Sequence, residues 1–172
     1  MEGDERRQFI LKLLAGSESP LSGTEIAGKC GVSRQIIVQD IALLRATNKN
    51  ILSTYRGYLL YQPEKDTENF KRTFAVSHTD EQIQDELYTF VDCGGKVLDV
   101  TVMHEIYGAI TVDLILNNRV DVDDFTTRLF TTPAKPIKEL TGGNHMHTVE
   151  ASSPEVFDRI EEQLKKKGYL IR

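Results

Sequence analysis

Apolar residues recur every three or four positions in three short segments near the start of the chain, the spacing expected of helices that bury one side. These segments cover residues 5–15, 22–30 and 34–47. In the third segment, Ile37, Ile41 and Leu44 form the apolar stripe, and Ser33 is a suitable N-terminal cap. The pattern therefore predicts three helices in succession.

After the third helix, two short runs rich in apolar and aromatic residues flank an Arg-Gly turn. These runs, residues 51–55 (ILSTY) and 58–61 (YLLY), predict a β-hairpin. Three helices followed by a hairpin is the order of a winged helix-turn-helix, and the short turn centred on Gly31 suits that motif. We therefore expect residues 1–62 to form a DNA-binding domain.

The remainder of the chain mixes strands with helices. The predicted strands cover residues 72–76, 96–102, 109–116, 145–151 and 169–171. The predicted helices cover residues 79–91, 121–130 and 154–167, with a loop or short helical turn at residues 133–140. A polar connector at residues 63–68 marks the boundary. The predicted fold class is α+β, with a mostly antiparallel sheet in a second domain over residues 63–172.

The charge balance separates the two parts. Residues 1–62 carry eight Lys or Arg against six Asp or Glu, whereas residues 63–172 carry thirteen against twenty. This asymmetry suggests two modules with different partners. There is no apolar run of membrane-spanning length, no secretory signal pattern at the N-terminus and no disulfide framework from two cysteines. We therefore expect a cytoplasmic protein without a membrane partner.

The third helix carries the residue types that read DNA. Arginine can pair bidentately with guanine and glutamine with adenine, while an arginine at the hairpin tip can contact phosphate or the minor groove. The predicted DNA-binding residues are Arg34, Gln35, Gln39, Arg45 and Arg56. The alternative is a three-helix bundle used for protein contact, with Arg34 merely solvated. Asp40 would repel phosphate, so we expect it to pair with a nearby arginine.

All four histidines lie in the second part of the chain, and two of them form the His-x-His pair His145 and His147. Alternate residues of a strand point the same way, so both imidazoles can face one metal ion. Two ordinary histidines, solvent-exposed or paired with other groups, would give the same pattern, and both interpretations stay open here. Further ligand candidates are His78, Glu86 and the competing carboxylates Glu81 and Asp85.

Two groups of motifs resemble known families. Residues 33–45 (SRQIIVQDIALLR) and 55–60 (YRGYLL) resemble the DNA-binding domain of biotin-repressor-like regulators. The second part resembles the 3H domain, a small ligand-binding module, through residues 76–78 (VSH), 102–108 (VMHEIYG) and 140–148 (LTGGNHMHT). With these motifs in this order, the whole chain is similar to nicotinate-responsive transcriptional repressors of the NiaR type.

This resemblance implies a homodimer that represses genes for NAD synthesis or niacin uptake, with operator DNA and nicotinic acid as partners. It also implies a divalent transition metal (nickel or zinc, with iron and manganese as further options) held by His78, Glu86, His145 and His147. The candidates for contact with the effector are His104, Tyr107, Thr141, Gly142 and Gly143. Tyr107 could instead belong to a strand-entry turn, and the glycines to a loop that needs positive φ.

Three other functions stay open at this point. Metal alone could be the signal, another small carboxylate could be the effector, or a metal with an open position could activate water in an enzyme acting on a small carboxylate. Against the enzyme, no convincing general base stands beside the predicted site, and the H-E-x-x-H, P-loop and nucleophile-elbow motifs are missing. We therefore predict a repressor without catalytic residues.

Overall fold

The computed structural model describes residues 1–47, 50–62 and 69–171. The chain forms two compact units, residues 1–65 and 66–172. The predicted polar connector at residues 63–68, which begins at the predicted domain boundary, lies outside the described residues. Buried apolar side chains are found in both units, so each has a hydrophobic core of its own.

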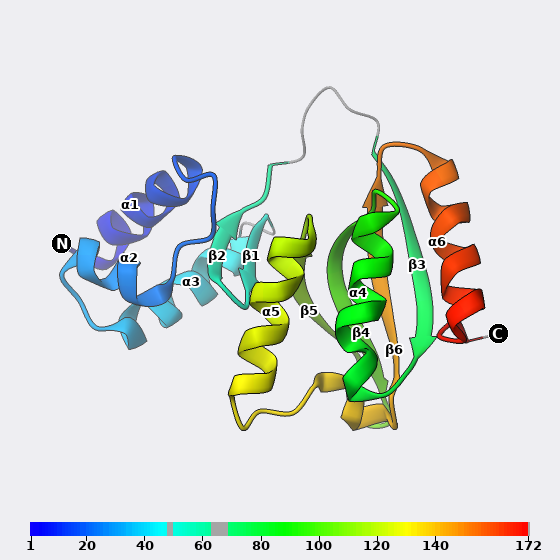
Figure 1. The fold of residues 1–172 in the computed structure, drawn as a ribbon. Coiled ribbons are helices and arrows are strands. Elements are labelled where there is room, and N and C mark those ends of the chain that lie inside the picture. Colours follow the sequence, from blue (N-terminus) through cyan, green and yellow to red (C-terminus); the bar gives the residue numbers. More distant parts are fainter. Residues whose placement is uncertain (48–49, 63–68, 172) are drawn as a thin grey trace. The chain divides into compact units, whose positions relative to one another are not determined.

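The first unit consists of three helices followed by a hairpin (Figure 1). The helices are α1 (Gly3–Ala15), α2 (Gly23–Cys30) and α3 (Arg34–Thr47). The antiparallel hairpin is formed by β1 (Ile51–Thr54) and β2 (Gly57–Leu60). An isolated bridge joins Leu21 to Tyr58, so the segment before α2 lies beside β2. This order confirms the predicted winged helix-turn-helix.

Local signals explain where α2 begins and ends. The Ser22 hydroxyl accepts a hydrogen bond from the Glu25 main-chain N–H at 3.1 Å, and the Glu25 carboxylate accepts one from the Ser22 N–H at 2.8 Å. This capping box satisfies amides that the first turn of a helix leaves unpaired. Gly31 ends α2 with a φ of 67°, a left-handed conformation that costs glycine little.

Apolar side chains from all three helices form the core of the first unit, and the predicted stripe of α3 is buried in it. Asp40, also on α3, is buried beside this core. Its carboxylate lies 2.6 Å from Arg6 Nε and 3.0 Å from Arg7 Nη1, both on α1. The predicted pairing of Asp40 with arginine is therefore confirmed, and it ties α3 to α1.

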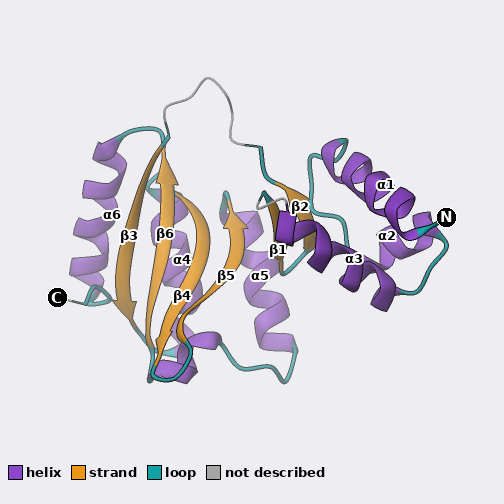
Figure 2. Ribbon diagram, turned by 180° about the vertical axis from the view of Figure 1, so that it is seen from behind, coloured by secondary structure: helices purple, strands orange, loops and turns teal. Residues whose placement is uncertain are grey.

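The second unit is an antiparallel sheet with helices on one face (Figures 1 and 2). Its strand order is β3-β6-β4-β5. The strands are β3 (Phe70–Ser77), β4 (Lys96–His104), β5 (Gly108–Leu116) and β6 (Asn144–Ala151). The helices are α4 (Ile83–Asp92), α5 (Arg119–Thr131) and α6 (Pro154–Lys167). Figure 2 shows the opposite face of the sheet, where no described helix lies. The predicted α+β class is confirmed.

Two connections of the second unit contain 3-10 turns. Thr79 caps the first of them, η1 (Asp80–Gln82), and the predicted capping box with Gln82 is present, but α4 begins only after this turn. The segment predicted as a loop or short helical turn contains the second, η2 (Ile137–Thr141). The first turn follows His78 at the end of β3, and the second precedes the start of β6, which carries His145 and His147.

Residues 169–171, predicted as a strand, form only an isolated bridge to β3, between Leu170 and Val76. Two main-chain hydrogen bonds hold this segment: Ser77 N–H donates to the Tyr169 carbonyl, and Ile171 N–H donates to the Ala75 carbonyl. Three residues offer too few bonds for a regular ladder. The segment nevertheless covers the outer edge of β3.

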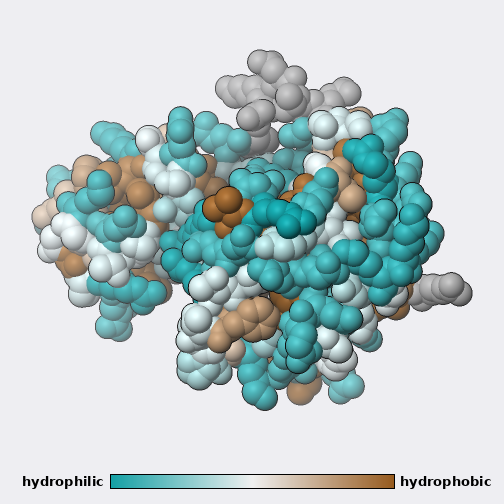
Figure 3. Space-filling view, in the orientation of Figure 1, coloured by the Kyte–Doolittle hydropathy of each residue, from teal (hydrophilic) through white to brown (hydrophobic). Residues whose placement is uncertain are grey.

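Strand alternation buries one side of β6 against the helices. His145, His147 and Val149 are buried on this side, whereas Met146 and Thr148, on the other side, are only partly buried. The outer surface of the helix layer is mainly hydrophilic (Figure 3). Within the described ranges, none of the helices has both the length and the apolar character that a membrane-spanning segment needs.

Replacing Asp40 with alanine is expected to destabilise the first unit by about 3 kcal/mol, because two partly buried arginines lose their counter-charge. Native-state hydrogen exchange of the α3 amides would measure this change separately from the second unit. The control is Asp4→Ala, because Asp4 also pairs with Arg7 but its side chain is 95% exposed. The control should change stability by less than about 0.5 kcal/mol. Equal losses in the two variants would contradict the prediction.

Candidate functional site

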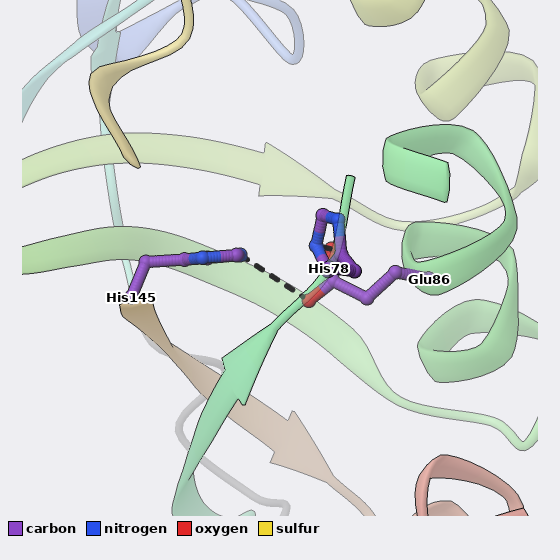
Figure 4. A group of neighbouring side chains, drawn as sticks. All are labelled: His78, Glu86 and His145. Atoms are coloured by element: carbon purple, nitrogen blue, oxygen red, sulfur yellow. Dashed lines mark ion pairs between the residues drawn. The ribbon is translucent and has the colours of Figure 1, made fainter. Parts of the chain in front are cut away.

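Residues from distant parts of the sequence meet between the sheet and α4 (Figure 4). His78 directly follows β3, Glu86 lies in the first turn of α4, and His145 lies in β6. Each of the three offers a ligand atom that lies within 4.8 Å of the other two. His147, two residues further along β6, is not part of this mutually close group, but its Nε2 lies 3.2 Å from Glu86 Oε1. These four residues are called the His–Glu cluster below.

Glu86 is the centre of the His–Glu cluster. Its exposed fraction is 1%, and its carboxylate lies 3.0 Å from His78 Nε2 and 3.6 Å from His145 Nε2. Burial raises the pKa of Glu86, but the positive charge that His147 can carry and the two other imidazoles close by outweigh burial and hold this pKa well below its ordinary value. Glu86 is therefore a carboxylate anion at neutral pH.

All three histidines of the cluster turn the same ring nitrogen away from Glu86. The Nδ1 atoms of His78, His145 and His147 lie 2.8, 2.8 and 2.7 Å from the main-chain carbonyl oxygens of Thr79, Gly143 and Asp99. A carbonyl only accepts hydrogen bonds, so each Nδ1 carries a proton. In the neutral ring, Nε2 then presents a lone pair toward Glu86. Histidines that bind metals are commonly oriented in the same way, by a hydrogen bond from the other ring nitrogen.

The cluster also contains two buried atoms without a hydrogen bond, His78 Nε2 and Glu86 Oε1. A lone pair that faces a carboxylate oxygen is repelled unless a cation lies between them, either a further proton or a metal ion. Burial lowers the pKa of His147, but the charge of Glu86 outweighs burial and raises it, so the cluster attracts positive charge. Three imidazole nitrogens and one carboxylate oxygen fit zinc, nickel or a related transition metal.

The competing carboxylates do not reach the cluster. Glu81 is exposed. Asp85 faces α6, where Lys167 Nζ lies 2.9 Å from both of its oxygens, and the Tyr169 hydroxyl donates a hydrogen bond to it at 2.8 Å. The hydrogen bond from Lys167 lowers the pKa of Asp85. Of the three neighbouring acidic residues, Glu86 is therefore the one placed to share a site with the histidines.

Asp99 supports the cluster from a neighbouring strand, and sequence reasoning missed it. The pairing of β4 with β6 shifts register between Val97 and Thr101. Within this irregular stretch, the Asp99 carbonyl accepts from His147 Nδ1, and the Asp99 carboxylate accepts from the Thr148 main-chain N–H at 3.0 Å. The sequence did contain one signal for Asp99, since it interrupts a run of residues that favour strands. Aspartate is disfavoured in a strand unless it has a local partner.

A groove of about 750 Å³ shares one residue, His145, with the cluster. Its apolar lining includes Met103, Met146 and Leu140. Among the predicted effector contacts, three line the groove: His104, Thr141 and Gly142. His145 also lines it and therefore belongs to both the groove and the cluster. A volume of this size is typical of small-molecule sites.

The other two predicted effector contacts, Tyr107 and Gly143, lie outside the lining of the groove, and their contact with an effector stays a prediction. Tyr107 is 76% exposed, because it belongs to the tight turn between β4 and β5. Gly143 has a φ of 97°, and its N–H donates to the Lys138 carbonyl, so it shapes the loop. These positions match the turn and loop interpretations of the sequence.

His104 has the opposite ring arrangement to the cluster histidines. Its Nδ1 accepts from the main-chain N–H groups of Ile106 at 3.2 Å and Tyr107 at 3.3 Å. In the neutral ring, the proton must therefore sit on Nε2. His104 can thus donate a hydrogen bond to an anionic group in the groove, whereas the cluster histidines offer lone pairs to a cation.

The predicted DNA-binding residues of α3 are all exposed, on the side away from its buried stripe. They are Arg34, Gln35, Gln39 and Arg45. Arg56 lies in the turn of the hairpin, with its guanidinium 5.4 Å from the centre of the Tyr55 ring. The structure therefore places these side chains where a winged helix-turn-helix would present them to DNA, and their contact with DNA stays a prediction.

Known proteins match both units and nearly the full length. The 3H domain family model matches residues 71–172, and a helix-turn-helix domain model matches residues 6–59. "Probable transcription repressor NiaR" of Thermotoga maritima is 40% identical over 167 residues, which is 97% of this chain and 94% of the relative. "Transcription repressor NadR" of Bacillus subtilis is 37% identical over 171 residues, covering 99% and 95%.

Asp99→Ala is expected to weaken zinc binding by about tenfold, because the carboxylate that accepts from the Thr148 N–H is lost and the irregular stretch that places the Asp99 carbonyl against His147 Nδ1 is loosened. Asp99→Asn retains a side-chain oxygen that can accept from Thr148 and should restore most of the affinity. Competition with a chromophoric chelator measures the affinity, and the visible spectrum of the cobalt-substituted protein reports the ligand geometry. Unchanged affinity and spectrum in a folded Asp99→Ala variant would show that Asp99 does not position His147.

Proposed function

The chain belongs to the 3H-domain family of helix-turn-helix transcription repressors, and we propose that nicotinic acid is its co-repressor and a divalent metal its resident cofactor. We further propose that its targets are genes of NAD synthesis or niacin uptake. The convergence of three Nε2 lone pairs on the buried Glu86 carboxylate, beside an open groove, carries the ligand proposal. The resemblance to NiaR-type repressors supports the targets.

Within this proposal, His78, Glu86, His145 and His147 hold the metal, with nickel or zinc favoured over iron or manganese by the nitrogen-rich donor set. When bound, the metal supplies a coordination position that a pyridine nitrogen can occupy. The protein's part is to keep the three rings in the required tautomer, through their Nδ1 hydrogen bonds. All three hydrogen bonds go to main-chain carbonyls of the protein itself, so the tautomers do not depend on a contact with the effector.

The groove suits the rest of a pyridine carboxylate. Met103 and Met146 offer apolar surface for the ring, and His104 offers its Nε2–H to the carboxylate. The Thr141 hydroxyl already donates within its own loop, to the carbonyls of Lys138 and Asn144. His104 is therefore the principal anion partner in this proposal. His145, shared by groove and cluster, supports an effector position next to the metal.

Repression then depends on a difference in affinity. Nicotinate and metal increase DNA binding only if they bind the DNA-competent arrangement better than its alternative. We propose that this arrangement is a homodimer, because a two-fold protein places two α3 helices on half-sites about 34 Å apart. The protein would act in the cytoplasm, on operator DNA.

Metal and nicotinate together should tighten binding to a DNA site selected from random sequence by about tenfold over metal alone. Chelation of the metal should abolish this gain. Fluorescence anisotropy at constant salt measures the affinity, and sedimentation of the same samples should show a dimer. If metal alone gave full DNA affinity, the protein would be a metal sensor. If only another vitamin carboxylate increased DNA affinity, that compound and not nicotinate would be the effector.

Arg34→Ala should weaken binding to the selected site by about 1–3 kcal/mol and reduce the preference for it over altered sites, because a bidentate base contact is lost. Lys12→Ala is the control, since Lys12 is an exposed cation of the same unit that lies on α1. Anisotropy titrations with the selected and altered DNA measure both effects. If the two variants lose affinity equally for every DNA sequence, Arg34 does not read a base.

A further inference from the structure

Lys138 is a buried lysine in η2, with an exposed fraction of 6%. Lysine is almost never buried to this degree unless its charge is paired. Its Nζ lies 2.5 Å from Asp80 Oδ1 and donates a hydrogen bond to the His78 carbonyl at 3.2 Å. The ammonium group is therefore attached to the segment that carries the first ligand of the His–Glu cluster.

The main chain of Lys138 holds a different segment. Its carbonyl accepts from the Gly143 N–H at 2.9 Å and from the Thr141 hydroxyl at 3.2 Å. Thr141 lines the groove, and Gly143 is the residue whose carbonyl orients His145. One residue thus connects the His78 segment, through its side chain, with the loop at residues 141–143, through its backbone.

We infer that Lys138 is a positioning residue that couples the metal ligand His78 to the groove loop at residues 141–143. Lys138 belongs neither to the cluster nor to the lining of the groove, so it acts through the groups it holds. A metal ion that restrains His78 would then also restrain this loop and so strengthen effector binding in the groove. By linkage, the effector would strengthen metal binding by the same factor. The inference rests on the proposed function.

The chemistry of the Lys138–Asp80 pair favours a role for Lys138 in coupling the two segments over a role in stabilising the fold alone. The Asp80 side chain is 42% exposed and can be hydrated alone, so a buried ammonium is not needed to neutralise it. The ammonium is the only group of Lys138 that reaches the His78 carbonyl. Methionine would keep an unbranched apolar side chain in the same space while removing this connection.

The test compares Lys138→Met with Lys135→Met in the full-length protein, with zinc as the probe. Lys135 lies three residues earlier, its side chain is 79% exposed, and it pairs with Glu139 on the surface. Lys138→Met should bind zinc about tenfold more weakly, and Lys135→Met should bind it like the unaltered protein. Chelator competition measures this affinity.

Amide exchange at residues 141–143 provides the second readout. Saturating zinc should slow this exchange in the unaltered protein and in Lys135→Met, and slow it clearly less in Lys138→Met. Some slowing should persist there, because His145 also contacts the loop through the Gly143 carbonyl. If Lys138→Met does not fold, Asp80→Asn, which loosens the same ammonium, should show both effects in weaker form.

Equal slowing of exchange in all folded variants would overturn the coupling, even if zinc affinity fell, because Lys138 would then only support His78. Equal zinc affinity would overturn it as well. Failure of the unaltered protein to bind zinc, nickel, iron or manganese would overturn the metal centre in the proposed function, and this inference with it. Metal binding by the unaltered protein therefore distinguishes failure of the coupling from failure of the proposed metal centre.

Discussion

A charged carboxylate buried between a sheet and a helix constrains the whole second unit. An unpaired carboxylate in such a place would cost several kcal/mol, so Glu86 can remain there only with cations or donors around it. These come from the end of β3 and the start of β6, which are neighbours in the sheet although 67 residues separate His78 from His145. The position of α4 on the sheet is thereby linked to the chemistry of the site.

The direction of each imidazole then separates two kinds of histidine. The three cluster rings donate from Nδ1 to carbonyls and present Nε2 to Glu86, whereas His104 accepts at Nδ1 and can donate from Nε2. The first arrangement suits a cation and the second suits an anion. A ligand with a basic ring nitrogen and a carboxylate would use both arrangements, which is the reason for proposing a pyridine carboxylate as the effector.

The first unit uses a buried carboxylate differently. Asp40 is paired with two permanently charged arginines of α1, so it has no capacity left for a ligand. Its effect is to hold α3 against α1 while the opposite side of α3, with Arg34 and Gln35, stays exposed. Buried acidic residues therefore hold α3 against α1 in one unit and gather the histidines of the cluster in the other.

The sequence by itself determined the order of elements, the buried stripe of α3 and the limits of most helices, because periodicity and capping act between near neighbours in the chain. It also contained the motifs that resemble NiaR-type repressors. Spacing along the chain left Glu86 and Asp85 both open, and only the resemblance pointed to Glu86. The tertiary structure shows that Glu86, not Asp85, faces the histidines and that Tyr107 lies outside the groove. It alone revealed Asp99 and Lys138, because spacing along a chain carries no information about distances across a sheet.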